Sequence, residues 1–298
     1  MVIETKALST LHAVMRAGSF AEAARELGFT GSAVSQQMSA LERSLGISLF
    51  ERQAKRVIAT EAAHYLSQRA DEVIDLVGQI EIDIARLGAG QVGKLRVGTF
   101  DSAGGPILGR AMARFLIRRR EVEITLDEGE PYELFPRVSE GSLDIALGFS
   151  YDLVTPHFPG DLRVSKVMTE DLFIVVSKKH RLAAKTNVEM DELADEIWVA
   201  HRPETASHQC LTTLCAQHGF SPKIAFRSNN IGTVQGIVAA GLGLAMIPEI
   251  ALSEEAGTVA LPINRSLPRR HIVSATRTND NNPLAAQFLE ALKKSASI

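Results

Sequence analysis

Residues 17–62 read AGSFAEAARELGFTGSAVSQQMSALERSLGISLFERQAKRVIATEA and carry the clearest structural pattern of the chain. Ser19 precedes Glu22 by three residues, which is a capping box: the Ser19 hydroxyl accepts from the Glu22 amide while the Glu22 side chain reaches back. Apolar residues recur around it at the three- and four-residue spacing of helices. The first 45 residues therefore predict three short helices, the second of which begins after Ser19.

The spacing of Ala24, Gly28 and Val34 is that of a helix-turn-helix. The small Ala24 lets the two helices touch, and Gly28 tolerates the positive φ of the tight turn. Val34 fills the core that the helices share, and Thr30 is placed to cap the third helix. The stretch therefore predicts a helix-turn-helix.

The third helix presents a polar, uncrowded face when its apolar residues point inward. This outward face consists of Ser32, Ser35, Gln36, Ser39 and Arg43. Gln can pair with an adenine edge in the major groove, Ser can contact bases or phosphates, and a helix N-terminus favours a phosphate. The predicted DNA-binding residues of this helix are Thr30, Gly31, Ser32, Ser35 and Gln36. The alternative is a small helical bundle whose polar face is merely solvated.

Two short extended pieces follow Leu45 and flank a group of cations, which is the pattern of a β-wing. The cations are Arg52, Lys55 and Arg56. Beside a helix-turn-helix we expect them to bind phosphates or to enter the adjacent minor groove. The alternative is an ordinary basic loop.

A long helix is predicted over 60–87, with Thr60 as its N-cap. Its apolar residues recur at alternating spacings of four and three, which is the period of a coiled coil. This seam consists of Leu66, Ala70, Val73, Val77, Ile80, Ile84 and Leu87. Because a winged domain is too small to cover so long a stripe, we expect the helix to pair with a second copy. The alternative is that the helix packs along its own domain.

Length and composition exclude several classes of protein. The 298 residues give room for two or more domains, and 45% hydrophobic with 22% charged residues excludes a disordered or collagen-like chain. The net charge is −3, but residues 1–58 carry seven Lys or Arg against five Asp or Glu, which permits DNA binding there. No apolar run reaches the ~20 residues of a membrane span, and two cysteines cannot make a disulfide scaffold. We expect a cytoplasmic protein without membrane contact.

From residue 94 onward, short β-rich runs alternate with helical stretches in two successive rounds. This order predicts two α/β lobes, each a sheet covered by helices, with a cleft between them. The predicted domains are a winged helix-turn-helix at 1–59, a linker helix at 60–87, a glycine-rich hinge at 88–93 and a two-lobed domain at 94–298. The first lobe is predicted to comprise about 94–163 and 270–298, and the second about 164–269.

Residues 17–62 resemble the DNA-binding region of the LysR-type transcriptional regulator family. GKLRVGTF at 93–100, GSLDIALG at 141–148 and VAAGLGLAMIP at 238–248 resemble its effector domain. The resemblance implies an α+β multidomain chain with an N-terminal winged helix-turn-helix, a long dimerising linker helix and a C-terminal two-lobed α/β domain like the periplasmic binding proteins. It also implies a bacterial homodimer or homotetramer whose partners are double-stranded operator DNA, a small effector and RNA polymerase.

The chain departs from the family pattern at the start of the third helix. Gly31 and Ser32 stand where the family commonly has Gln or Thr followed by Pro, and Ala63 stands where it often has Gly. A glycine at position 31 removes one possible base contact, so the operator preference does not follow from the resemblance.

The expected ligand cleft lies beyond the carboxyl ends of the strands, where ligands bind in open α/β sheets. By resemblance, Ser102, Thr205 and Asn229 match positions that line the family's effector site. The predicted effector-binding residues are Thr99, Ser102, Phe149, Arg202, Thr205 and Asn229. Helix N-termini and hydroxyl groups suit a small carboxylate, to which Arg202 could add a counter-charge. The alternative for each residue is an ordinary loop or helix cap.

Nothing in the sequence assembles into a catalytic or metal-binding set, so we expect neither an enzyme nor a cofactor. Cys210 and Cys215 lie five residues apart on one predicted helix and point in different directions, so they are expected to serve packing. The leading hypothesis is a sequence-specific transcriptional regulator controlled by a small effector between two lobes. The alternatives are a solute-binding or sensory module that oligomerises without regulating transcription, and a two-lobed α/β enzyme.

Overall fold

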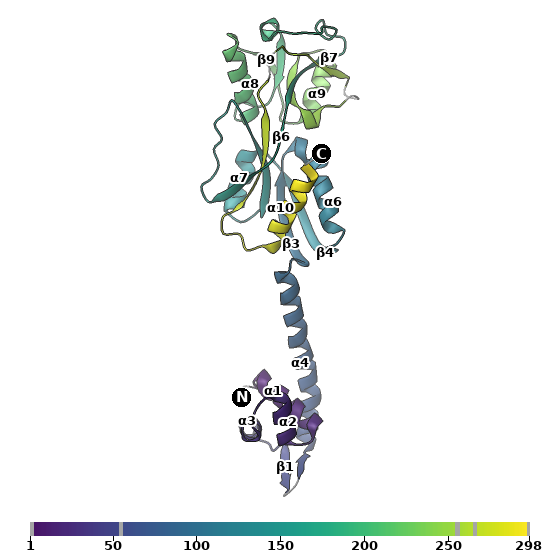
Figure 1. Cartoon of the computed structure of the whole chain (residues 1–298), viewed down its shortest axis with the longest axis vertical. Coiled ribbons are helices and arrows are strands. Elements are labelled where there is room, and N and C mark those ends of the chain that lie inside the picture. The colour runs from purple at the N-terminus through teal and green to yellow at the C-terminus, as the bar shows by residue number, and fades with distance from the viewer. Residues whose placement is uncertain (1–2, 54–55, 254–256, 265–266, 297–298) are drawn as a thin grey trace. The chain divides into compact units, whose positions relative to one another are not determined.

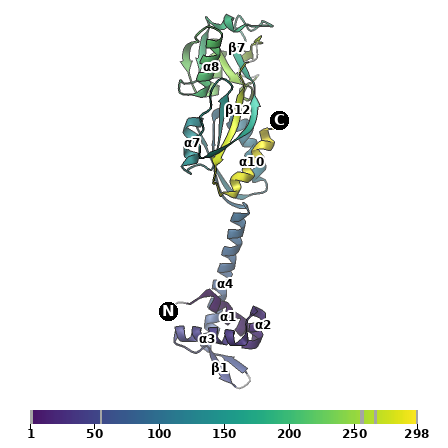
Figure 2. The same ribbon diagram turned by 60° about the vertical axis from the view of Figure 1, so that its left-hand side comes forward.

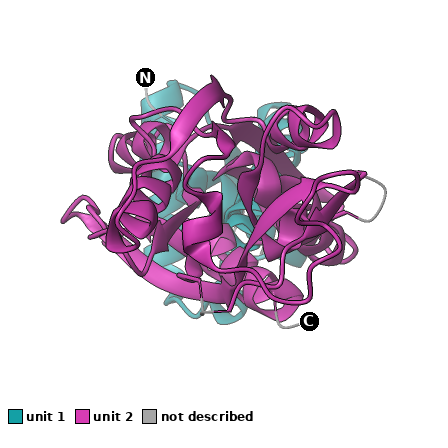
Figure 3. Ribbon diagram, turned by 90° about the horizontal axis from the view of Figure 1, so that it is seen from above, with its two compact units in different colours: residues 1–87 teal, residues 88–298 magenta. Residues whose placement is uncertain are grey.

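The computed structural model describes residues 3–53, 56–253, 257–264 and 267–296. The chain divides into two compact units, Met1–Leu87 and Gly88–Ile298 (Figure 3). No helix among the described residues is long and apolar enough to cross a membrane.

The first unit consists of short helices, a hairpin and one long helix. The helices are α1 (Thr5–Ala17), α2 (Phe20–Leu27), α3 (Gly31–Leu45) and α4 (Glu61–Gly88), and the hairpin strands are β1 (Phe50–Gln53) and β2 (Arg56–Ala59). The short helices gather around the beginning of α4, with the hairpin beside them (Figure 2). The predicted winged helix-turn-helix followed by a long helix is confirmed.

Local side-chain bonds explain where these helices begin. The Ser19 hydroxyl accepts from the Glu22 amide at 3.1 Å, whereas the Glu22 carboxylate pairs with Arg25 instead of reaching back. Gly28 adopts φ 68° in the turn, and Ala24 and Val34 are buried in the core of this unit. The spacing rule of the helix-turn-helix therefore describes real packing.

The first lobe of the second unit is built on a five-stranded sheet of order β4-β3-β5-β12-β6. Figure 1 labels β3, β4 and β6 of this sheet together with the helices α6, α7 and α10. Its strands are β3 (Val92–Thr99), β4 (Glu121–Glu128), β5 (Ile145–Tyr151), β6 (Leu162–Glu170) and β12 (Arg270–Arg277). The strands β3, β4 and β5 are parallel, and β12 is antiparallel to both β5 and β6. Helices α6 (Arg110–Leu116) and α10 (Pro283–Ala296) pack on one face of the sheet and α7 (Pro131–Ser139) on the other.

The second lobe has smaller sheets. Strand β7 (Leu172–Ser177) pairs with β10 (Ala245–Pro248) and β11 (Thr258–Ala260), while β8 (Ile197–Ala200) runs parallel to β9 (Lys223–Arg227). Its helices are α8 (Ala206–Gln217), α9 (Ile231–Ala239) and the 3-10 turns η2 (Met190–Leu193) and η3 (Glu249–Ala251). The predicted two-lobed α/β architecture is confirmed.

Three predicted boundaries shift in the structure. Strand β6 pairs with β12 through Glu170, so the first lobe extends beyond the predicted limit near residue 163. Gly88 ends α4 and Val92 begins β3, so the segment without regular structure is shorter than 88–93. From residue 94 onward the sequence also predicts a helix that starts at Pro106; in the structure it begins earlier with α5 (Asp101–Ala103), and the π-helical turn η1 (Gly104–Gly109) accommodates the proline, which has no amide hydrogen to donate.

Candidate nucleic-acid interface and ligand cleft

Helix α3 buries one face and exposes the other. Val34, Met38 and Leu41 are buried in the core, whereas Ser32 and Gln36 are exposed. Ser35 and Ser39 are half-buried on the same outward side. A shallow hollow runs along this face and includes Ser35, Gln36, Ser39 and Arg43 among its lining residues. The outward face expected from the sequence is therefore available to a partner.

The first turn of α3 is held by Thr30, whose hydroxyl accepts from the Ala33 amide at 3.2 Å and lies 3.0 Å from the Ser32 hydroxyl. Thr30 therefore acts first as a cap. Gly31 is exposed, and a side chain built there would meet only the Ala21 backbone at an ordinary distance of 3.9 Å. The structure thus leaves room at position 31 for a Cβ atom.

The wing is attached to α3 by a carboxylate that the sequence analysis did not single out. Glu42 accepts from the backbone amides of Leu49 and Phe50 at 2.8 and 3.1 Å. The backbones of Arg52 and Arg56 lie in the hairpin strands, opposite Val57 and Gln53 respectively, and Lys55 falls outside the described residues. Glu42 thereby sets the start of the hairpin that carries the expected cations.

The apolar stripe of α4 has two parts. Ala63 and Ala70 are buried in the first unit, and Leu66 packs against its core. The later members of the stripe, with two apolar neighbours, are exposed: Val73, Leu76, Val77, Ile80, Ile82, Ile84 and Leu87. Packing along its own domain therefore accounts for the first turns of α4 only, and the remaining stripe requires a partner surface.

The second unit contains two adjoining hollows where its lobes meet. The first, which we name the apolar cavity, has a volume of about 320 Å³. Its lining includes Tyr132, Phe135, Phe149, Val154 and Phe158. The second, which we name the polar cleft, has a volume of about 390 Å³ and is lined by Asp101, Glu128, Gly129, Glu130, Tyr132, Glu133, Arg202, Glu204, Arg227, Ser228, Asn229 and Asn230. Both hollows share Glu130, Tyr132 and Glu204, so they lie side by side and these three residues border both.

The predicted effector residues divide between lining and support. Arg202 and Asn229 line the polar cleft, and Phe149 lines the apolar cavity. Arg202 and Asn229 also hold each other, because the Arg202 amide donates to the Asn229 side-chain oxygen at 3.0 Å. These two residues therefore set the wall that the second lobe contributes.

Three predicted effector residues, Thr99, Ser102 and Thr205, are not among the lining residues of either hollow. Thr205 is buried as the N-cap of α8, where its hydroxyl accepts from the His208 amide and donates to the Arg202 carbonyl. Thr99 is buried at the end of β3. Ser102 accepts a hydrogen bond from Arg270 at 3.0 Å. Each of the three hydroxyl groups thus takes part in a hydrogen bond within the protein.

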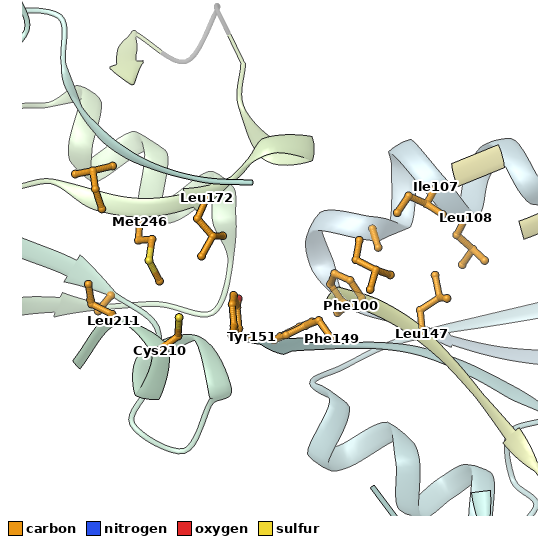
Figure 4. Packing of buried hydrophobic residues seen from close by; sticks show 14 of the residues in the cluster. Phe100, Ile107, Leu108, Leu147, Phe149, Tyr151, Leu172, Cys210, Leu211 and Met246 are labelled. Atoms are coloured by element: carbon orange, nitrogen blue, oxygen red, sulfur yellow. The ribbon is translucent and has the colours of Figure 1, made fainter. Parts of the chain in front are cut away.

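Arg270 and Glu170 form a buried ion pair that the sequence analysis missed. The Arg270 Nε atom donates to Glu170 at 2.7 Å, and both side chains are almost fully removed from solvent. The guanidinium lies over the rings of Phe100 and Phe149, 5.2 and 5.3 Å from their centroids. Figure 4 shows Phe100, Phe149 and Tyr151 following one another toward the side chains of the second lobe. The pair therefore supports the floor of the ligand cleft.

Asp101, which follows β3, links the first lobe to the second. Its carboxylate accepts from the backbone amide of Ile231, the first residue of α9, at 2.6 Å. The positive end of a helix favours such an anion. The chain thus fills the N-terminus of α9 with its own carboxylate.

Burial and neighbouring carboxylates raise the pKa of Glu130 to about 7. Desolvation is the largest cause, Glu133, Asp101 and Glu204 act in the same direction, and Arg270 opposes them. Glu130 is therefore a partly protonated carboxyl group at neutral pH, placed at the point that the two hollows share.

The raised pKa of Glu130 should make the free energy of unfolding depend on pH. A carboxyl group whose pKa is raised by folding stabilises the folded state only while it is protonated. The contribution is complete below the ordinary value near 4.5 and is lost as the pH rises through about 7. We expect Glu130→Gln to increase the free energy of unfolding at pH 8 by about 1 to 3 kcal/mol and to change it little at pH 4.5. Denaturant unfolding at both pH values measures this, with the exposed Glu140→Gln at the other end of α7 as control. Equal effects at the two pH values would contradict the prediction.

The cysteines offer no reactive group. Cys210 and Cys215 are free and buried, and burial raises the pKa of each to about 12. Because the thiolate is the reactive form, both thiols are expected to be inert at neutral pH, in accord with a role in packing.

Comparisons with known proteins cover both units. The family model of the LysR substrate binding domain matches residues 88–297, and that of the bacterial regulatory helix-turn-helix protein, lysR family, matches residues 5–64. The chain is 24% identical over 286 residues to the uncharacterized HTH-type transcriptional regulator YfeR of Shigella flexneri, covering 95% of this chain and 91% of that protein. It is 25% identical over 291 residues to the HTH-type transcriptional regulator XapR of Escherichia coli, covering 97% of each.

Solved structures share the fold over nearly the whole chain. A full-length OxyR variant from Pseudomonas aeruginosa matches with a TM-score of 0.76 at 19% identity, covering 99% of this chain and all of that one. Full-length CbnR complexed with its target DNA matches with a TM-score of 0.69 at 22% identity, covering 99% and 100% of the two chains. The order of winged domain, long helix and two-lobed domain is thus common to all three.

Proposed function

The chain belongs to the LysR family of transcriptional regulators, and from this premise we propose how its own residues bind DNA and sense a ligand. It is a DNA-binding regulator with a substrate-binding domain. We propose that α3 enters the major groove with Gln36 and Ser32 toward the bases, and that Arg52, Lys55 and Arg56 of the wing hold phosphates.

The observation that carries this proposal is the division of α3 into a buried and an exposed face. Gln36 is exposed and projects from the side opposite the buried Val34 and Met38. A side chain in this position can reach a base edge without disturbing the core. The proposed domains remain 1–59 for DNA binding, 60–87 for the linker helix and 94–298 for ligand binding, with a hinge between the last two.

We further propose that a small effector binds where the lobes meet and changes their relative position. A ligand can shift such an equilibrium only when it binds one arrangement better, and regulatory couplings are typically about 1 to 3 kcal/mol. The contact from Asp101 to Ile231 joins the two lobes, so it is the bond that such a movement would change. Assembly into dimers or tetramers, contact with RNA polymerase and a cytoplasmic location are parts of this proposal.

Operator binding by two variants tests the assignment. Gln36→Ala should cost about 1 to 3 kcal/mol at one operator position and relax the base preference there. Arg56→Ala should weaken binding to all sequences alike and lower the salt slope by about one. Gel shift on the DNA upstream of the gene, repeated over a salt series, measures both effects.

The two variants serve as controls for each other, since a general folding defect would change them in the same way. Unchanged affinity and an unchanged salt slope in both would remove the DNA-binding assignment of these residues. A solute-binding module and a two-lobed enzyme, the alternatives, have no observation in their favour among the residues that the structure describes.

A further inference from the structure

The walls of the apolar cavity are shaped for a ring. Phe135 and Phe149 face it from α7 and β5 of the first lobe, and Ala206 and Gln209 of α8 close it from the second. Gly148 makes this wall possible, because a side chain there would clash with the Phe135 ring. At about 320 Å³ the cavity lies at the small end of ligand sites, which fits one aromatic ring with a short chain.

The charges at the mouth of this cavity are predominantly negative. The polar cleft is lined by five carboxylates, Asp101, Glu128, Glu130, Glu133 and Glu204, and by two guanidinium groups, Arg202 and Arg227. Within the described part of the chain, no ion pair joins either of these arginines to a carboxylate of the cleft. Two of the carboxylates, Glu130 and Glu204, also border the apolar cavity.

Some charged groups of the polar cleft already bind other groups of the protein, which limits where the charged group of a ligand can bind. Asp101 binds the α9 N-terminus, and the Glu133 carboxylate accepts from the Glu130 backbone amide at 2.8 Å. The charge of Arg270, which lies over the Phe149 ring, is neutralised by Glu170, whose carboxylate accepts from the Arg270 Nε atom at 2.7 Å. Glu130 also caps α7, because its side chain accepts from the Glu133 backbone amide. Of the five carboxylates of the polar cleft, Glu130 and Glu204 are the two that border both hollows.

We propose that this site binds a small ligand with an aromatic ring and a protonated amine, its ring in the apolar cavity and its ammonium group between Glu130 and Glu204. The inference deepens the proposed function, because it assigns a chemical class to the effector of the same domain. It replaces the small carboxylate expected from the sequence. An anion would meet the excess of carboxylates, and the helix N-terminus of α9 that could attract it is occupied by Asp101.

The binding should depend on pH through Glu130. The charged groups that face it are Glu133 from α7, Asp101 from α5, Glu204 from the segment before α8 and Arg270 from β12. An ammonium ion binds the ionised carboxylate better than the protonated carboxyl, and an alkyl amine stays protonated at pH 6 to 8. Since the pKa of Glu130 is about 7, affinity for the amine should rise across this range.

Calorimetric titration of the full chain with a matched pair of probes tests the inference. The probes are 2-phenylethylamine and 3-phenylpropionate, which share a ring and a short chain but differ in the sign of charge. At pH 8 we expect the amine to bind about tenfold more tightly than the acid, and about tenfold more tightly than the same amine at pH 6. Glu130→Gln should weaken the amine about tenfold and remove the pH dependence, and Glu204→Gln should weaken it as well.

Glu140→Gln, at the C-terminal cap of α7 and outside the lining of both hollows, is the matched control and should bind as wild type does. The inference is overturned if the acid binds as tightly as the amine, if the amine shows no binding at about 10 mM, or if Glu130→Gln binds it unchanged. Gel shift on upstream DNA separates this result from the proposed function. If the chain binds DNA but not the amine, the proposed function stands and the proposed ligand class is wrong. If it binds the amine but not DNA, the ligand class stands and the proposed function is wrong.

Discussion

Replacing Val77 and Ile80 together by Asp is expected to break the assembly of the chain and to lower operator affinity more than about 100-fold. Both side chains are exposed on α4, with 36% and 52% of their surface open to solvent. A second copy that covers this stripe would bury the new carboxylates, and an unpaired buried charge costs several kcal/mol. Loss of the dimer also removes one of the two recognition helices that bind the operator together.

The mass in solution, measured by light scattering, and gel shift on the same samples check this result. The substituted positions are exposed in the single chain, so the variant should keep the helical content of wild type. Gln68→Asp together with Gln79→Asp is the matched control, since it adds the same charge to exposed polar positions of the same helix. An unchanged mass of the Val77 and Ile80 variant would show that the stripe is not the assembly surface.

Local rules explain which parts of the fold were predictable from the sequence. The cap at Ser19, the turn at Gly28 and the buried Val34 involve residues close together in the chain, so their spacing was sufficient. The apolar stripe of α4 was equally visible in the sequence. Its division into a part buried in its own unit and an exposed part was not. Whether Ala70 meets its own domain and Ile80 does not depends on how far the first unit extends along the helix.

The ligand cleft was less predictable because its important contacts join distant residues. Glu170 and Arg270 are separated by 100 positions, and Asp101 and Ile231 by 130. In the sequence each is one charged or apolar residue at the end of a strand or helix, with nothing to indicate its partner. The Thr205 hydroxyl shows the same limit: its place before a helix was visible in the sequence, but its burial in the cap of α8 was not.

The buried ion pair below the cleft leads to the second large effect, for which Arg270→Met is the test. The variant leaves Glu170 without its cation in a site where it is almost fully buried, although the carboxylate still accepts from the Ile250 amide at 2.9 Å. Removing one partner of a buried pair typically costs about 3 to 5 kcal/mol, because the remaining charge is uncompensated. The chain has one tryptophan, Trp198, buried in the second lobe, so its fluorescence during denaturant unfolding reports on this unit alone.

The neighbouring ion pair of Arg269 and Asp171 is the control, because it has the same chemistry but is exposed to solvent. Arg269 and Asp171 lie 3.0 Å apart with more than half of each side chain exposed, so Arg269→Met should cost less than about 1 kcal/mol. Adding Glu170→Gln to Arg270→Met should recover part of the loss, because a neutral amide keeps an acceptor for Ile250 and removes the unpaired charge. If Arg270→Met costs no more than Arg269→Met, the Glu170 pair does not stabilise the cleft. If the double variant is less stable than Arg270→Met alone, the uncompensated charge is not the cause of the loss.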